Sequence, residues 1–196
     1  MCFHSKQTKS AQELKNRFKV EFPKENDYLP KESINGFEHP FTPVITSEKP
    51  NEIHLYQWGL IPSWAKNTTI QKDTLLAKIE TIKEVASYKA ITHQRCLILA
   101  DGFYEWKHHD SKGKDTEKFL ITIENDKPFA FAGLWSKWRN PMNGIEYSTY
   151  SMLTIRVKKV EYLITSEKFR ELGWIKKIKF HAPFRTENDN NEYPDF

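Results

Sequence analysis

The stretch RCLILADGFYEW at residues 95–106 combines aliphatic and aromatic residues in a short run that a β-strand accommodates well. Five further runs share this composition, and Gly, Pro, Asp or Asn residues separate them along the chain. They are PVITSE at 43–48, IHLYQWGLI at 53–61, KFLITIE at 118–124, FAFAGLW at 129–135 and STYSMLTI at 148–155. We therefore expect an α+β fold, mainly β, in which an antiparallel, distorted barrel-like sheet is joined by a few helices.

The segments around these runs predict one helix and several loops. Ser10 can cap a helix over residues 10–20, because Ala11, Leu14 and Phe18 recur at a spacing of three and four. The proline-rich stretch at 23–43 should hold extended segments and wrap the surface rather than form a core. The polar stretches at 110–115 and 139–144 predict hairpin connections.

The length and composition indicate an intracellular protein with one main domain. The chain has 196 residues, of which 38% are hydrophobic and 14% aromatic, enough for a core. No apolar run approaches the roughly 20 residues of a membrane-spanning helix, and the N-terminus lacks the apolar centre of a secretory signal. Two cysteines without zinc-ligand spacing fit a reducing compartment and predict no metal site. We expect a cytoplasmic monomer without membrane contact.

Charge divides the chain after residue 155. Residues 156–185 hold 9 Lys and Arg against 3 Asp and Glu, whereas residues 186–196 hold 4 acidic residues and no basic one. We predict a domain over residues 1–155, a divergent basic segment over 156–185 that packs on it, and an acidic, disordered tail over 186–196.

Cys2 is a candidate nucleophile because removal of Met1 would expose an α-amino group on a thiol-bearing residue. The reference pKa of such an amine is near 8, so part of it is uncharged and nucleophilic at neutral pH. A 1,2-aminothiol condenses with an aldehyde and closes a thiazolidine ring, which points to an aldehyde substrate. Position alone favours the other interpretation, in which Cys2 is an ordinary residue beside the initiator.

Five motifs in order resemble the SRAP (SOS response-associated peptidase) family of abasic-site processing proteins. They are MCFHS at the start, WGLIPSWAK at 58–66, LAKIET at 76–81, RCLILADGFYEW at 95–106 and FAFAGLW at 129–135. The resemblance covers about residues 1–155. It implies a single SRAP-like domain that acts in the DNA damage (SOS) response on abasic sites in single-stranded DNA.

The resemblance also implies the reaction and its residues. Cys2 matches the nucleophile that forms a covalent thiazolidine DNA–protein crosslink after Met1 is removed, and Glu105 matches the active-site glutamate. A carboxylate there can hold the amine and relay protons; without the resemblance, Glu105 would be a surface acid at a strand end. The resemblance also implies lyase activity, because the imine intermediate permits strand cleavage. Family members are catalogued as peptidases, which are proteases and therefore hydrolases. No metal or organic cofactor is implied.

Two positions depart from the family pattern. Leu76 stands where the family has an asparagine that positions the cysteine and the sugar, and leucine can neither donate nor accept a hydrogen bond. The family's active-site histidine has no counterpart, since the later His181 lacks its sequence context. We interpret the abrupt end of the match as a frameshift, truncation or recombination.

Aromatic and basic residues interleave where we expect DNA contact. The candidates are Trp64, Lys66, Lys78 and Lys89, since rings stack on unpaired bases and cations follow the phosphates. Lys78 keeps the charge with which the family contacts phosphate. Packing at the core or rim would also account for Trp64, and we assign Trp58 to the core.

Three functions of different kinds fit these observations. The first is a crosslinking enzyme that survives the loss of the asparagine and the histidine. The second is a non-catalytic module that binds single-stranded DNA, and the third is a degenerate remnant with a damaged core. A crosslink that depends on Cys2 distinguishes the first from the others.

Overall fold

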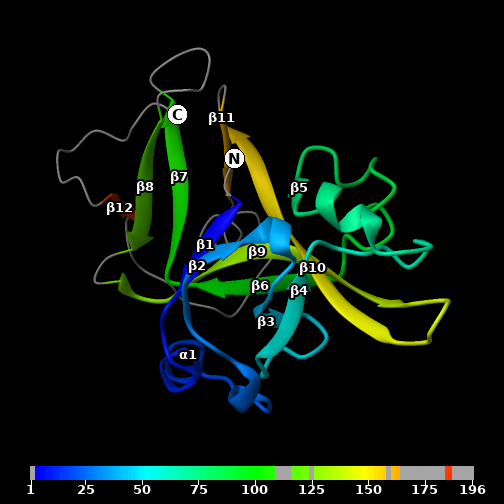
Figure 1. Ribbon diagram of the computed structural model, residues 1–196, viewed down its shortest axis with the longest axis horizontal. Helices are drawn as coiled ribbons and strands as arrows, with labels where there is room; N and C mark the ends of the chain where they lie inside the picture. The colour runs from blue at the N-terminus through cyan, green and yellow to red at the C-terminus, as the bar shows by residue number, and fades with distance from the viewer. Residues whose placement is uncertain (1–2, 109–115, 124–125, 158–159, 164–183, 187–196) are drawn as a thin grey trace.

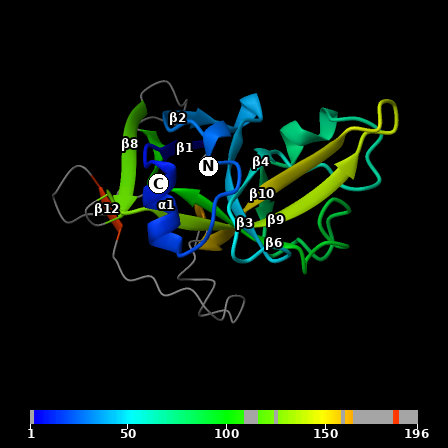
Figure 2. The same ribbon diagram turned by 90° about the horizontal axis from the view of Figure 1, so that it is seen from below.

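The computed structural model describes residues 3–108, 116–123, 126–157, 160–163 and 184–186. Their strands form two sheets, which lie on the two sides of the molecule in both views (Figures 1 and 2). One α-helix and three short 3₁₀ helices join them, namely α1 (Ala11–Phe18), η1 (Glu25–Asp27), η2 (Gly36–Glu38) and η3 (Thr69–Asp73). The described part is therefore mainly β, as the sequence predicts.

The larger sheet closes into a barrel. Its strands pair in the order β10, β4, β3, β6 and β9, and β9 pairs back onto β10. These strands are β3 (Phe41–Thr46), β4 (His54–Trp58), β6 (Arg95–Ala100), β9 (Phe129–Arg139) and β10 (Glu146–Val157). Two flanking strands, β5 (Leu76–Lys78) and β11 (Val160–Leu163), also pair with β10. Most pairs are antiparallel as predicted, whereas β4 and β5 run parallel to β10.

The alternation of side chains along the strands fills the barrel. On β6, Ile98 joins the central cluster, which includes Trp58, Phe131, Tyr150 and Met152. The alternate residues Leu97 and Leu99 point outward and pack with α1. A two-residue period thus divides one apolar strand between two cores.

The smaller sheet has five strands in the order β12, β8, β7, β1 and β2. Their bounds are β1 (His4–Gln7), β2 (Lys31–Asn35), β7 (Gly102–His108), β8 (Thr116–Ile123) and β12 (Phe184–Thr186). One face of this sheet covers an end of the barrel, because Ile34 and Ile123 belong to the central cluster and Phe3 and Phe103 pack against it. The Phe103 ring meets the Phe131 ring edge-on at 5.6 Å between centroids.

The run 95–106 is not the single strand that its composition predicts. It divides at Asp101 into β6, which belongs to the barrel, and β7, which belongs to the five-stranded sheet. Both carboxylate oxygens of Asp101 accept hydrogen bonds from Thr8, and the backbone N–H of Asp101 donates to the Lys6 carbonyl at 3.0 Å. The chain therefore turns from one sheet into the other at a buried, fully bonded aspartate.

The predicted helix is confirmed as α1, with Ser10 and Glu13 forming a reciprocal capping box. The expectation for residues 23–43 is partly wrong. Tyr28 and Ile34 in this stretch are buried in two different core clusters, and β2 pairs with β1. Isolated apolar residues between prolines are thus buried here, because this part of the chain pairs along the edge of a sheet and packs on the core.

The two predicted connections differ in outcome. Residues 140–145 join β9 to β10 in a hairpin, as predicted for 139–144, whereas 110–115 lie outside the described residues. The described parts of the predicted basic segment are strand residues, since β11 pairs with β10 and β12 with β8. The division at 155 and the disordered tail remain predictions. Across the described ranges, no helix is long and apolar enough to cross a membrane.

The close contact of β9 with both of its neighbours predicts the effect of a Gly133→Ala substitution. A Cβ at Gly133 would collide with Ile98 and come within 2.7 Å of the Ser151 carbonyl oxygen. We expect a loss of about 1–3 kcal/mol in the free energy of unfolding, measured in urea. Met142→Ala on the exposed hairpin is the control and should change it by less than about 0.5 kcal/mol; equal effects would contradict the barrel closure.

Candidate functional site

The first described residue, Phe3, lies where the N-terminal strand enters the five-stranded sheet. Its carbonyl accepts a hydrogen bond from the Gly36 N–H at 2.8 Å, and β1 pairs with β2 on one side and β7 on the other. Cys2 itself lies outside the described residues. Because a trans peptide joins neighbouring Cα atoms at about 3.8 Å, the position of Phe3 limits where Cys2 can be.

Glu105 lies on β7 next to this strand. His4 pairs with Tyr104, so the antiparallel register sets Phe3 beside Glu105. By alternation, the Glu105 side chain lies on the same face as Phe103, which packs against the central cluster. Burial raises the pKa of the Glu105 carboxyl, and a hydrogen bond to the Trp106 backbone opposes this in part. A carboxyl with a raised pKa is suited to transferring protons near neutral pH.

The opposite face of β7 carries a different group of side chains. The His4 and Trp106 rings meet at 4.9 Å between centroids, and the Lys118 ammonium lies 3.9 Å from the centre of the Tyr104 ring. Burial lowers the pKa of His4, the positive charge of Lys118 adds to this effect, and Glu38 opposes it. These residues point away from the Glu105 side of the sheet.

The motif LAKIET forms β5 and the turn after it. Leu76 packs against the central cluster, and its carbonyl accepts a hydrogen bond from the Tyr88 hydroxyl at 3.2 Å. Lys78, two residues on, is exposed. Position 76 therefore contributes an apolar surface and no hydrogen-bonding side chain.

Trp64 is exposed, whereas Trp58 is fully buried. The Trp64 side chain is 58% exposed, and its indole N–H donates to the Ala86 carbonyl at 3.4 Å. Trp58 stacks on Tyr150 and donates to the Leu75 carbonyl, which confirms its assignment to the core. An exposed tryptophan offers a surface on which a base could stack.

The predicted DNA-contact residues share one region. Ala86 and Tyr88, which bond to Trp64 and to β5, lie in the same segment as Lys89. Lys66 follows Trp64 by two residues, and Lys66, Lys78 and Lys89 are all exposed. Hydrogen bonds thus link Trp64, the Lys89 segment and the strand that carries Lys78.

The two parts of the candidate site meet the same core. Phe103 from the Glu105 strand, Leu76 from the Lys78 strand and Phe3 all pack against the central cluster. Sequence reasoning missed two further features here: the exposed ring of Phe37 against Phe3, and the Thr154 hydroxyl, buried on β10 beside Lys78 without a hydrogen-bond partner. Single residues outside a motif give no signal in the sequence.

Other candidate chemistry is not supported in the described residues. Cys96 is buried in the central cluster, and burial raises the pKa of its thiol, so it is a core residue rather than a second nucleophile. Within the same ranges, no group of three or more His, Cys, Asp or Glu residues could hold a metal ion.

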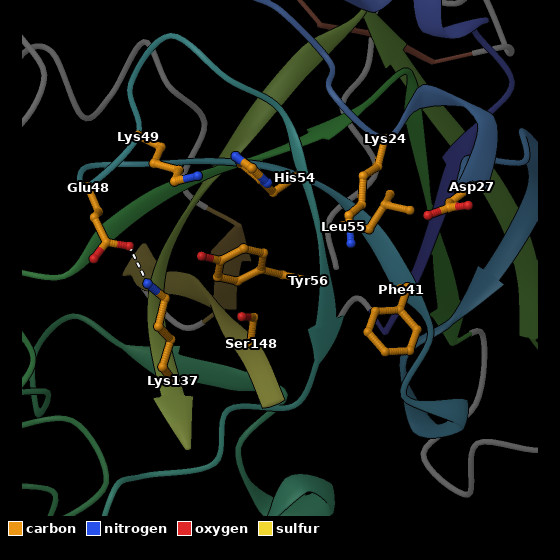
Figure 3. A pocket seen from close by; sticks show the side chains of 10 residues that line it. All are labelled: Lys24, Asp27, Phe41, Glu48, Lys49, His54, Leu55, Tyr56, Lys137 and Ser148. Atoms are coloured by element: carbon orange, nitrogen blue, oxygen red, sulfur yellow. Dashed lines mark hydrogen bonds and ion pairs between the residues drawn. The ribbon is translucent and has the colours of Figure 1, made fainter. Parts of the chain in front are cut away.

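An open depression of about 490 Å³ lies at the other end of the barrel strands (Figure 3). Tyr56 and Ser148 line it, and they precede Trp58 and Tyr150 on the parallel strands β4 and β10. Among the lining residues, Lys137 pairs with Glu48 at 2.5 Å. Lys49 and His54 both pair with Glu52, which lies outside the lining. Glu105, Trp64, Lys66, Lys78 and Lys89, the predicted site residues that the structure describes, are not among the residues that line this depression.

In this fold, a second sheet that contains the N-terminal strand covers one end of a barrel. Solved proteins have the same arrangement. A structure from Bacteroides thetaiotaomicron matches 91% of this chain and 83% of its own, with a TM-score of 0.78 and 25% identity. A structure from Bordetella bronchiseptica matches 88% of this chain and 87% of its own, with a TM-score of 0.69 and 19% identity. The fold is therefore that of a known structural class.

A profile of the family described as SOS response associated peptidase (SRAP) matches residues 1–164. The chain belongs to this family, as its motifs predict.

Named relatives agree with this assignment. Abasic site processing protein YoqW of Bacillus subtilis is 37% identical over 122 residues, which are 62% of this chain and 53% of the relative. Abasic site processing protein YoaM of the same organism is 34% identical over 72% of this chain and 60% of its own length. Abasic site processing protein HMCES of Xenopus tropicalis is 31% identical over 50% of this chain and 35% of its own length. The matched region spans between one third and three fifths of each of these relatives.

The raised pKa of Glu105 predicts how its stability contribution depends on pH. An acid whose pKa is raised by folding destabilises the folded state as pH rises above its unfolded pKa of about 4.3. We expect Glu105→Gln to have a melting temperature closest to that of the parent near pH 4, and a higher one at pH 7. Thermal melts of both proteins at both pH values measure this. A parent protein that melts at a higher temperature than Glu105→Gln at pH 7 would contradict it.

Proposed function

We propose that this chain processes abasic sites in single-stranded DNA by forming a covalent crosslink through Cys2. The observation that carries the proposal is the partly buried Glu105, set by the β1–β7 register beside the strand that follows Cys2. Family membership and the names of the relatives support the substrate. The proposal covers activity in the DNA damage (SOS) response.

The chemistry follows from the two groups that Cys2 carries once Met1 is removed. The amine adds to the open-chain aldehyde of the abasic sugar and loses one water to give an imine. The thiol then adds across the C=N bond and closes a thiazolidine, with its proton passing to nitrogen. The adduct equals protein plus DNA minus one water, and no cofactor or metal takes part.

Glu105 is the proton carrier in this proposal. Imine formation requires an acid to release water and a base to take the proton of the attacking amine, and one carboxyl can do both in turn. Burial raises the pKa of the Glu105 carboxyl above that of an ordinary glutamate, which suits it to both roles. The same group could support strand cleavage by β-elimination from the imine, which is lyase activity.

The exposed residues near β5 supply the DNA contacts. We assign stacking on a base to Trp64 and phosphate contacts to Lys66, Lys78 and Lys89, because all four are exposed. Leu76 removes the polar group that positions the sugar in the family pattern, so crosslinking should be slowed. A non-covalent DNA-binding protein is the alternative that Leu76 favours.

Intact mass spectrometry tests the crosslink directly. The purified chain is measured alone and after incubation with single-stranded DNA that carries one abasic site. We expect loss of Met1 and an adduct of protein plus oligonucleotide minus one water, and we expect Cys2→Ala to form none. Cys96→Ala is the matched control and should retain the adduct, because Cys96 is buried.

Two outcomes would contradict the proposal. An adduct that persists in Cys2→Ala would assign the chemistry to another nucleophile. Removal of Met1 without an adduct would leave the DNA-binding alternative.

The DNA contacts predict a second set of results. Trp64→Ala should weaken binding of single-stranded DNA about tenfold, whereas Trp64→Phe keeps most of the affinity, because base stacking on an aromatic ring contributes about 1–3 kcal/mol. Lys78→Gln should reduce the slope of log affinity against log salt by about 0.7, the value for one single-strand phosphate contact. Fluorescence anisotropy at several salt concentrations measures both. Unchanged affinity in Trp64→Ala would place the DNA elsewhere.

A further inference from the structure

An exposed aromatic ring lies next to the start of the N-terminal strand. The Phe37 side chain is 53% exposed, and its ring centroid is 4.8 Å from that of Phe3. Phe3 in turn packs against the central cluster. The two rings contact each other at a tilt and lead from the core to solvent, and Phe3 is the residue that follows Cys2.

The backbone around Phe37 fixes this ring in place. The Asn35 side chain accepts a hydrogen bond from the Phe37 N–H at 3.1 Å at the start of η2, and the Gly36 N–H donates to the Phe3 carbonyl. A Cβ at Gly36 would lie 3.1 Å from the buried Trp58 ring, so η2 is seated directly on the core. The outward position of Phe37 is therefore set by the fold.

The charges around Phe37 suit a base better than a phosphate. Glu38 follows it on η2 and accepts a hydrogen bond from the Asn35 side chain at 3.4 Å, and its negative charge also acts on His4. A carboxylate repels phosphate, whereas it leaves stacking on the adjacent ring intact. The surface thus favours an uncharged, flat group.

We propose that Phe37, supported by Phe3, is a stacking platform for the base next to the abasic sugar, and that it makes this chain select abasic sites by their neighbouring base. The inference rests on the proposed function, because the abasic sugar must reach Cys2 beside Phe3. An abasic site leaves the neighbouring base without a stacking partner on one side. An exposed ring at the attachment point supplies that partner, and a purine covers it better than a pyrimidine.

Binding without crosslinking tests the platform. The probes are single-stranded oligonucleotides with one tetrahydrofuran residue, which mimics the abasic sugar but cannot open to an aldehyde. The nucleotides on either side carry adenine or thymine, or are further tetrahydrofuran residues that carry no base. On at least one side of the abasic site, we expect an oligonucleotide with an adenine neighbour to bind about tenfold more tightly than one with a tetrahydrofuran neighbour. This ratio follows from the free energy of stacking one base. 2-Aminopurine at that position should lose fluorescence on binding.

Three variants assign the effect to Phe37. Phe37→Leu keeps the apolar contact with Phe3 and should reduce the neighbour preference to within about twofold, because the flat ring is lost. Phe37→Trp should retain the preference. Phe41→Leu removes another exposed ring, 63% exposed, and should leave the preference unchanged.

The results separate the two proposals. Absence of a neighbour preference in the parent chain, absence of binding, or an equal preference in Phe37→Leu would overturn the platform. A lost preference in Phe41→Leu as well would assign the effect to general aromatic contact and overturn it too. Failure of the Cys2 adduct on true abasic DNA, with the preference intact on tetrahydrofuran, would overturn only the crosslinking function.

Discussion

The hydrogen bonds of the buried Asp101 carboxylate hold the two sheets together. Thr8, just after β1, donates to both of its oxygens, while the Asp101 N–H bonds to Lys6 at the point where the chain leaves the barrel. A buried carboxylate without such donors would cost several kcal/mol, so these bonds are needed for the turn to exist. They fix β1 against β7. The register of β1 then sets Phe3, the residue that follows Cys2 in the sequence, beside Glu105.

The sequence predicts the barrel well because its strands are apolar and aromatic, and α1 well because its cap and periodicity agree. The five-stranded sheet is harder to predict. β1 buries Ser5 and Gln7, so its polar sequence HSKQ lacks the alternation that indicates a strand. The continuous run 95–106 hides a change of sheet, because only the hydrogen bonds of Asp101 to a distant segment mark it. Tertiary contacts decide both cases.

The candidate site shows the same division. Its motifs indicate which residues matter, and strand alternation assigns Glu105 to the inner face of β7. Trp58 is assigned correctly to the core from the sequence, whereas packing and DNA contact both account for Trp64 until the fold shows it to be exposed. Phe37 belongs to none of the motifs. Its proximity to Phe3 depends on η2 resting on Trp58, a contact between residues far apart in sequence.

The proposed site has leucine rather than asparagine at position 76, and its function can be explained by apolar contacts of Phe3, Phe37 and Leu76. A side-chain amide would hold the sugar by hydrogen bonds, whereas leucine supplies only contact area. Stacking of the neighbouring base on Phe37 would position the same sugar through the DNA backbone instead. Burial raises the pKa of the Glu105 carboxyl, and the exclusion of water at a buried carboxyl would favour the dehydration that forms an imine. In the proposed mechanism, orientation therefore passes from the sugar to the adjacent base, while proton transfer stays with Glu105.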